Sequence, residues 1–91
     1  MEVHNIFLDR LPKIDLHGYD TESARVATDD FISDSIKLGY KEILIIHGLG
    51  SGLVKESVHS TLSKNKNVLS YKLDYFNNGC TIIELKSNEK S

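Results

Sequence analysis

Residues 41–64 read KEILIIHGLGSGLVKESVHSTLSK, and this stretch decides the fold class. Its first part, Lys41–His47, is a β-branched run that ends at glycine, which is typical of a strand buried on both faces. Residues 48–52 form a glycine-rich turn, and apolar residues then recur at helical spacing over Leu53–Lys64. A strand that enters a helix through a glycine turn indicates an α/β domain.

A second unit of the same kind precedes this stretch. Residues 13–18, KIDLHG, predict a short strand that stops at glycine. The next helix is expected from about Glu22 to Leu38, with Asp20 or Thr21 as its N-cap. Its buried stripe is expected to comprise Ala24, Ala27, Phe31, Ile32, Ser35 and Ile36.

The C-terminal part of the chain predicts a β-hairpin. Residues 68–76 alternate as a strand does, Asn77-Asn78-Gly79 is a strong turn sequence, and residues 80–86 return as the last strand. One face of the first of these strands is expected to carry Leu69, Tyr71, Leu73 and Tyr75. The order is therefore β-α-β-α-β-β, an α/β fold with a mixed four-stranded sheet and two helices.

Three segments are expected along the chain: an N-terminal arm packed on the domain (1–13), the domain itself (14–86) and a flexible polar tail (87–91). No apolar run approaches the roughly 20 residues that a membrane span needs. Cys80 is the only cysteine and cannot form an internal disulfide. Together these features predict a cytoplasmic protein with no membrane partner.

Charge is unevenly distributed, although the net charge is only −2. Residues 1–36 carry eight acidic and three basic residues, whereas residues 37–72 carry six lysines and two glutamates. A basic half beside an acidic half is compatible with a phosphate-facing side, and equally with an uneven solvated surface.

The chemistry is expected where the first two strands end. Asp15 and His17 are two apart on a strand and so point the same way. Ligands of α/β sheets collect beyond the carboxyl ends of parallel strands, and His47 follows the second strand at such an end. If the two strands are neighbours, these three side chains form a candidate catalytic site, although a single histidine at a strand end is more often a structural residue than a catalyst.

The turn of residues 48–52 is a candidate phosphate site. Backbone amides of glycines approach a phosphate without obstruction, and the following helix N-terminus carries partial positive charge. The turn lacks the Lys-Ser/Thr pair of a P-loop, so a simple tight turn remains the alternative. The expected nucleic-acid or phosphate contacts are Gly48, Gly50, Ser51, Gly52, Lys55 and His59.

Two routes of phosphodiester cleavage fit these residues differently. A zinc site or a two-magnesium centre is poorly supplied with ligands, so no metal ligand and no cofactor is expected, although dependence on a divalent metal stays open. A metal-independent route uses one imidazole or Asp15 as the base and a histidine as the acid. The 2′-hydroxyl of RNA supplies its own nucleophile, and histidine titrates near neutral pH.

The motifs resemble those of the Smr (small MutS-related) domain family. IDLHG at residues 14–18 is similar to its first signature, IIHGLGSG at 45–52 to its HGxGxG signature, and TIIEL at 81–85 to its final strand. The resemblance implies a fold similar to the C-terminal domain of a bacterial translation initiation factor. It also implies DNA nicking or RNA cleavage in some members, and nucleic-acid or ribosome binding in others.

The resemblance ties Asp15 and His17 to cleavage, and the HGxGxG positions to substrate binding and catalysis. Several positions depart from the usual pattern. Leu49 and Lys55 stand where lysine and arginine are common, and Ser51 stands where threonine is common but keeps the hydroxyl. Asn78-Gly79 stands where a glycine pair is common. A lysine lacks the bidentate phosphate geometry of arginine, so weaker substrate contacts are expected.

Three functions remain open from the sequence: an endonuclease on RNA or DNA, a non-catalytic module that binds nucleic acid or the ribosome, and a protein-interaction domain that uses the apolar arm and Leu49.

Overall fold

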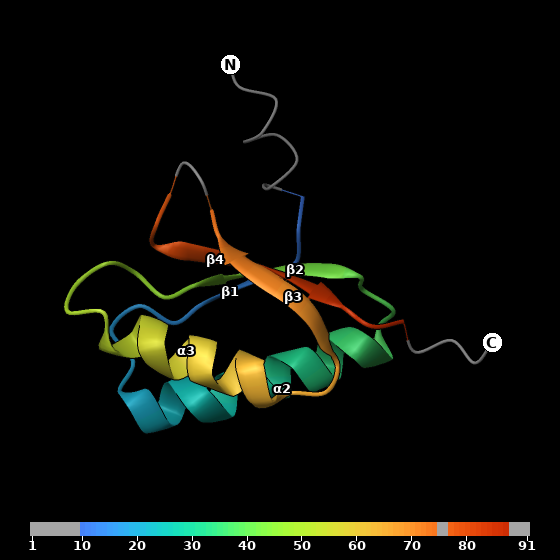
Figure 1. Cartoon of the computed structure of the whole chain (residues 1–91), viewed down its shortest axis with the longest axis horizontal. Helices are drawn as coiled ribbons and strands as arrows, with labels where there is room; N and C mark the ends of the chain where they lie inside the picture. The colour runs from blue at the N-terminus through green and yellow to red at the C-terminus, as the bar shows by residue number, and fades with distance from the viewer. Residues whose placement is uncertain (1–9, 75–76, 88–91) are drawn as a thin grey trace, which may run out of the picture.

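The computed structural model describes residues 10–74 and 77–87 (Figure 1). The elements follow the predicted β-α-β-α-β-β order. They are β1 (Lys13–Asp15), α2 (Thr21–Lys37), β2 (Glu42–Ile46), α3 (Leu53–Lys64), β3 (Val68–Leu73) and β4 (Cys80–Leu85). The predicted bounds of α3 are confirmed, and those of the other elements differ by a few residues at one or both ends.

The four strands form one mixed sheet in the order β1-β2-β4-β3. The pair β1/β2 is parallel, and the pairs β2/β4 and β3/β4 are antiparallel. Both helices cover the same face of this sheet (Figure 1). They lie side by side, and the Ser57 hydroxyl on α3 donates to the Thr21 carbonyl on α2 over 2.8 Å.

The core lies between the sheet and the two helices. The central strand β2 is buried on both faces, as its sequence predicts: Ile43, Leu44 and Ile45 are all buried. Thr28 and Ser35 are buried on α2, and their hydroxyls have no hydrogen-bond partner among the described residues. The buried apolar cluster consists of Leu16, Ala24, Ile32, Ile43, Ile45, Val58, Leu62, Ile83 and Leu85.

Helix α2 begins at a side-chain cap. Asp20 is the N-cap, and its Oδ1 accepts from the backbone N–H of Ser23 over 2.7 Å. Of the two residues that the sequence offered, Asp20 rather than Thr21 therefore caps the helix. The hydrogen bonds from Ser23 hold the pKa of this carboxyl below its usual value.

The expected face of β3 was partly wrong. Val68 pairs with Leu85 and Ser70 with Glu84, so the register shifts by one residue between them. Because such an irregularity reverses the alternation, Val68 packs against the core while the Leu69 side chain is 57% exposed. Tyr71, in contrast, packs against the core.

Some expectations fall outside the described residues. These are the arm over residues 1–9, Tyr75 and Phe76, and the tail over residues 88–91. In the described part of the chain, no helix is long and apolar enough to cross a membrane.

Ile45 and Leu69 are both aliphatic strand residues, but Ile45 is buried and Leu69 is exposed, so their substitution should affect stability differently. Replacing Ile45, which is fully buried in the central strand, with alanine should lower the free energy of unfolding by about 2–5 kcal/mol, because the change leaves a cavity. The matched change Leu69→Ala removes an exposed side chain and should cost less than about 0.5 kcal/mol. Urea denaturation of both variants measures the difference, and equal losses would contradict the assigned core.

Candidate functional site

Parallel pairing of β1 with β2 brings the two motifs to one edge of the sheet. Asp15 is the partner of Ile46, and the Leu16 amide donates to the Ile46 carbonyl over 2.6 Å. A hollow of about 500 Å³ opens just beyond these strand ends. Its lining comes from both motifs and from α3: His17, Gly18, Tyr19, Ile46, His47, Gly48, Leu49, Gly50, Ser51, Gly52, Val54 and Lys55.

Asp15 and His17 form a hydrogen-bonded pair, as their spacing predicts. Asp15 Oδ1 accepts from the His17 backbone N–H over 3.1 Å and lies 2.6 Å from His17 Nδ1. Both side chains are more than half exposed. The hydrogen bond from the His17 ring is the main reason that the pKa of Asp15 lies below its usual value. An ionised carboxylate only accepts, so His17 carries hydrogen on Nδ1, and no residue of the described chain bonds its Nε2.

Part of the loop is already hydrogen-bonded within the protein. The amide of Gly48 donates to the Gly79 carbonyl over 3.0 Å, and the amide of Gly52 donates to the Leu49 carbonyl over 3.2 Å. Ser51 Oγ accepts from the Leu53 amide over 3.3 Å. The amides of Gly48 and Gly52 are therefore occupied and do not point a free N–H into the hollow.

Other donors of the loop stay available. Within the described residues, the amides of Gly50, Ser51, Val54 and Lys55 have no acceptor. They lie at the start of α3, where unpaired N–H groups and the helix dipole favour an anion. Lys55 lines the same hollow and adds a positive charge.

His47 lies differently from His17. Its side chain is only 3% exposed, and it follows Ile43 and Ile45 on the helix-covered face of the sheet. Its Nδ1 lies 3.0 Å from the Gly48 carbonyl oxygen, and its Nε2 lies 2.7 Å from Thr81 Oγ1. Burial lowers the pKa of His47, and the charge on Lys55 lowers it further. Both ring nitrogens are thus engaged inside the protein.

His59 is not part of the hollow's lining. Its Nε2 lies 2.8 Å from the same Thr81 hydroxyl, and its ring makes edge contacts with His47 and Tyr71 at centroid distances of 5.7 and 5.1 Å. Burial again lowers its pKa, and the neighbouring His47 adds to the effect. The structure therefore brings His17, His47 and Lys55 to one hollow and places His59 beneath it.

Two features were missed by reasoning from the sequence. The Gly79 carbonyl accepts from the amides of both His47 and Gly48, so the β3–β4 turn holds the glycine loop. Thr81 is fully buried and joins the two inner histidines. A signal for Thr81 exists in the alternation of β4, where a threonine occupies a core-facing position in line with Ile83 and Leu85.

The described residues contain no group of three or more His, Cys, Asp or Glu arranged to hold a metal ion. Cys80 is buried, which raises the pKa of its thiol.

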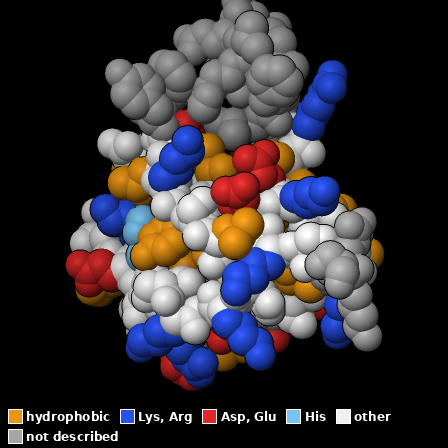
Figure 2. Space-filling model, turned by 45° about the vertical axis from the view of Figure 1, so that its right-hand side comes forward, with side chains coloured by type: hydrophobic (Ala, Val, Ile, Leu, Met, Phe, Trp, Pro, Cys, Tyr) orange, Lys and Arg blue, Asp and Glu red, His pale blue; other side chains and the backbone are white. Residues whose placement is uncertain are grey.

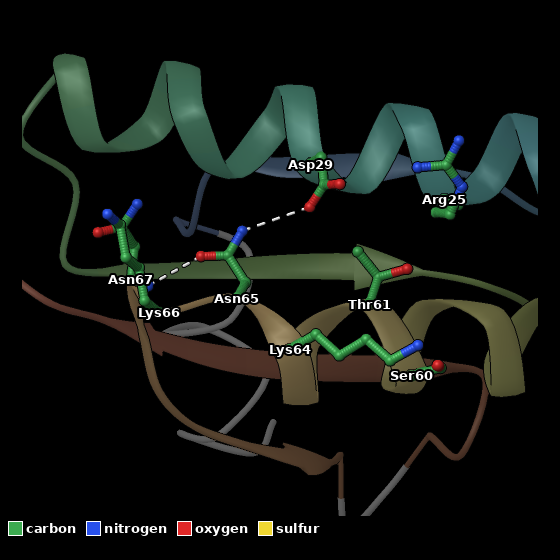
Figure 3. A pocket seen from close by; sticks show the side chains of 8 residues that line it. All are labelled: Arg25, Asp29, Ser60, Thr61, Lys64, Asn65, Lys66 and Asn67. Carbon is green, nitrogen blue, oxygen red and sulfur yellow. Dashed lines mark hydrogen bonds between the residues drawn. The ribbon is translucent and has the colours of Figure 1, made fainter.

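A second hollow lies between α2 and α3 and contains none of the predicted site residues (Figure 3). Arg25 there forms an ion pair with Glu22, and the Asp29 carboxylate accepts from the side-chain amide of Asn65 over 3.3 Å. Lys64 and Lys66 also line it. Figure 2 shows Lys and Arg side chains, with acidic side chains among them, at the bottom of the view, on the helix side of the molecule.

Comparison with known proteins gives consistent matches. The Smr domain family matches residues 14–86. Endonuclease MutS2 of Clostridium novyi (strain NT) is 36% identical over 76 residues, which cover 80% of this chain and 10% of that protein. Endonuclease MutS2 of Halothermothrix orenii is 38% identical over 79 residues, with 84% and 10% covered. The chain thus spans about a tenth of the length of these curated relatives.

Two solved structures share the fold. The Smr domain of Thermus thermophilus MutS2 superposes with a TM-score of 0.81 at 23% identity, covering 84% of this chain and 99% of that one. YdaL, a stand-alone small MutS-related protein from Escherichia coli, gives a TM-score of 0.80 at 22% identity, with 86% and 66% covered. The predicted mixed α/β fold is confirmed by these likenesses.

Gly48 tests how tightly the loop lies against His17. Its φ is +80°, and a Cβ added there would lie 3.1 Å from His17 Cβ. Gly39 has a φ of +81° and nothing within 4 Å of such a Cβ. We expect Gly39→Ala to lower the free energy of unfolding by about 1–2 kcal/mol, because of backbone strain alone. Gly48→Ala should lower the free energy of unfolding by more than this and also displace His17, because the added Cβ would lie against the His17 side chain. Urea denaturation and the ring signals of His17 in NMR spectra report the two effects, and identical behaviour of both variants would contradict the contact.

The buried histidines predict a pH-dependent stability. Because the pKa values of His47 and His59 lie below the ordinary 6.5, the unfolded chain binds protons there at a higher pH than the folded chain does. The free energy of unfolding should therefore fall as the pH drops below 6.5, by at most about 1.4 kcal/mol per pH unit for each histidine. The pKa values of Asp15 and Asp20 lie below the usual 3.8, so the stability that these carboxylates add is lost only at a lower pH than the range in which the histidines act. Denaturation between pH 5 and 7.5 should give a shallower slope for His59→Gln, and an unchanged slope would refute this assignment.

Proposed function

Because the chain belongs to the Smr domain family, we propose that it binds nucleic acid in the hollow beside His17 and cleaves a phosphodiester bond there. The observation that carries the proposal is the Asp15–His17 pair, which leaves His17 Nε2 exposed at the rim of a hollow with free amide donors. The matched relatives are named endonucleases, which agrees with this reading.

His17 is the catalytic base in this proposal. Asp15 accepts the Nδ1 hydrogen, which fixes the ring and leaves the lone pair of Nε2 free. In RNA, Nε2 takes the proton of a 2′-hydroxyl as that oxygen bonds to phosphorus. The bond from phosphorus to the 5′ oxygen then breaks, and the proton passes to that oxygen. The products are a 2′,3′-cyclic phosphate and a 5′-hydroxyl. RNA is favoured over DNA because it supplies the nucleophile that a single imidazole can activate.

The loop holds the phosphate. The unpaired amides of Gly50 and Ser51 and the ammonium group of Lys55 supply donors and positive charge, and the Ser51 hydroxyl hydrogen is free to donate. Tyr19 and Leu49 are 44% and 69% exposed at this hollow and offer apolar surface to a base or sugar. Gly48 and His47 shape the loop, since their polar groups are engaged within the protein.

The proposal predicts cleavage that depends on His17. The assay incubates labelled structured RNA, and separately supercoiled plasmid DNA, with purified protein with and without EDTA. His17→Ala should slow RNA cleavage by about 10²- to 10⁴-fold, the usual size of a lost general base, without unfolding, since the side chain is exposed. Asp15→Asn should slow it less. Undiminished cleavage by the His17 variant would point to another site, and nicking of plasmid alone would make DNA the substrate.

A matched pair of lysines on α3 separates binding from catalysis. Lys55 lines the hollow, whereas Lys64 lies at the other end of the helix. Lys55→Gln should weaken binding and reduce the slope of log K against log salt by about 0.7–0.9, the release from one phosphate contact. Lys64→Gln should change neither. Salt-dependent binding that weakens in the Lys55 variant, with no product from any substrate, would support a non-catalytic binding module instead.

A further inference from the structure

Two histidines approach the hydroxyl group of Thr81: His47, which lines the hollow, and His59, which does not. Thr81 Oγ1 lies 2.7 Å from His47 Nε2 and 2.8 Å from His59 Nε2. Thr81 comes from β4, His47 from the end of β2 and His59 from the middle of α3, so the cluster joins the sheet to the helix that follows the glycine loop.

When both histidines are neutral, the hydrogen bonds of this cluster allow only one assignment of donors and acceptors. The Gly48 carbonyl accepts only, so His47 carries its hydrogen on Nδ1. His47 Nε2 is then an acceptor and receives the Thr81 hydrogen. Thr81 has one hydrogen to give, so His59 must donate to it from Nε2. The resulting chain runs from His59 through Thr81 and His47 to the Gly48 carbonyl.

The surroundings of the cluster favour the neutral form of both rings. Burial lowers the pKa of each histidine, and the hydrogen bond to the Gly48 carbonyl only partly offsets this for His47. His47 is almost fully buried, Thr81 is fully buried, and the two imidazoles contact each other edge to face. The titratable groups that face the pair are Lys55 on α3, whose charge lowers both pKa values, and Tyr71 on β3, whose ring contacts His59. If both histidines were protonated, their positive charges would lie beside each other and near the charge of Lys55, which is unfavourable.

This series of hydrogen bonds ends at Gly48, which lies beside His17. The carbonyl of Gly48 is held by His47, and its amide is held by the Gly79 carbonyl. Gly48 lies so close to His17 that a Cβ would meet His17 Cβ at 3.1 Å. Any turn of the Gly48 peptide would therefore alter both the loop and the place of His17.

We propose that His59, Thr81 and His47 are positioning residues, which fix the Gly48 peptide through this one-way hydrogen-bond chain and thereby set His17 against the phosphate-binding loop. The catalytic part of this inference rests on the proposed function, whereas the donor-to-acceptor direction of the hydrogen bonds does not. His59 thus acts from below the loop instead of touching the substrate.

The direction of the chain is tested on the free protein. Two-bond ¹H–¹⁵N NMR spectra at pH 7.5 should show hydrogen on Nδ1 of His47 and on Nε2 of His59. Thr81→Val keeps the shape of the side chain but removes the hydroxyl, so the His59 tautomer should become mixed and the Gly48 amide signal should shift. Thr81→Ser, which keeps the hydroxyl, should retain the wild-type spectrum. Hydrogen on Nε2 of neutral His47 would overturn the inference, and the wild-type spectrum decides this even if Thr81→Val does not fold.

The effect on the reaction is tested with the same two variants. Thr81→Val should lower kcat by up to about 100-fold, the size of a misplacement of about 1 Å, with little change in KM, and Thr81→Ser should restore kcat. A folded Thr81→Val variant with wild-type kcat and an unmoved Gly48 signal would refute the positioning role. If the wild-type protein cleaves no substrate, the proposed function fails, while the tautomers and the Gly48 signal still decide whether the chain exists.

Discussion

Parallel pairing of β1 with β2 is the constraint on which the candidate site depends. The two strands are joined in register at Asp15 and Ile46, and the Leu16 amide continues the ladder to the Ile46 carbonyl. Both strands therefore end at the same edge of the sheet, and both chains turn there toward their helices. Without this pairing, the Asp15–His17 pair and the glycine loop would be unrelated surface features. Burial of Leu16 under the helices holds the short β1 in place.

The faces of the sheet give the two strand-end histidines different environments. Asp15 and Ile46 lie on the face away from the helices, and His17 extends from that side into solvent beside its carboxylate partner. His47 continues the core-facing positions of β2 and lies beneath the loop. One imidazole is thus exposed, with no partner for its Nε2 among the described residues, and the other is a buried part of the scaffold. This division follows from the alternation of side chains along a strand.

The backbone amides of the glycine loop likewise fall into two groups, those bonded within the protein and those left unpaired. The amides of Gly48 and Gly52 close the loop on itself and on the β3–β4 turn. Within the described residues, the amides of Gly50, Ser51, Val54 and Lys55 stay unpaired. In the proposed function, a loop held at both ends presents these donors to a phosphate without reorganising, and such preorganisation is what electrostatic stabilisation of a developing charge needs. The turn at Gly79 supports the site although it lies far away in the sequence.

The sequence by itself determined the features that depend on near neighbours. The order of the elements, the bounds of α3 and the shared side of Asp15 and His17 all follow from backbone periodicity over a few residues. Only the tertiary structure decided which groups remain free. The partner of His47 is Thr81, 34 positions along the chain, and the irregularity that exposes Leu69 depends on how β3 pairs with β4. Hydrogen-bond occupancy and burial are set by residues that meet only when the sheet is assembled, and no local pattern records which partners those will be.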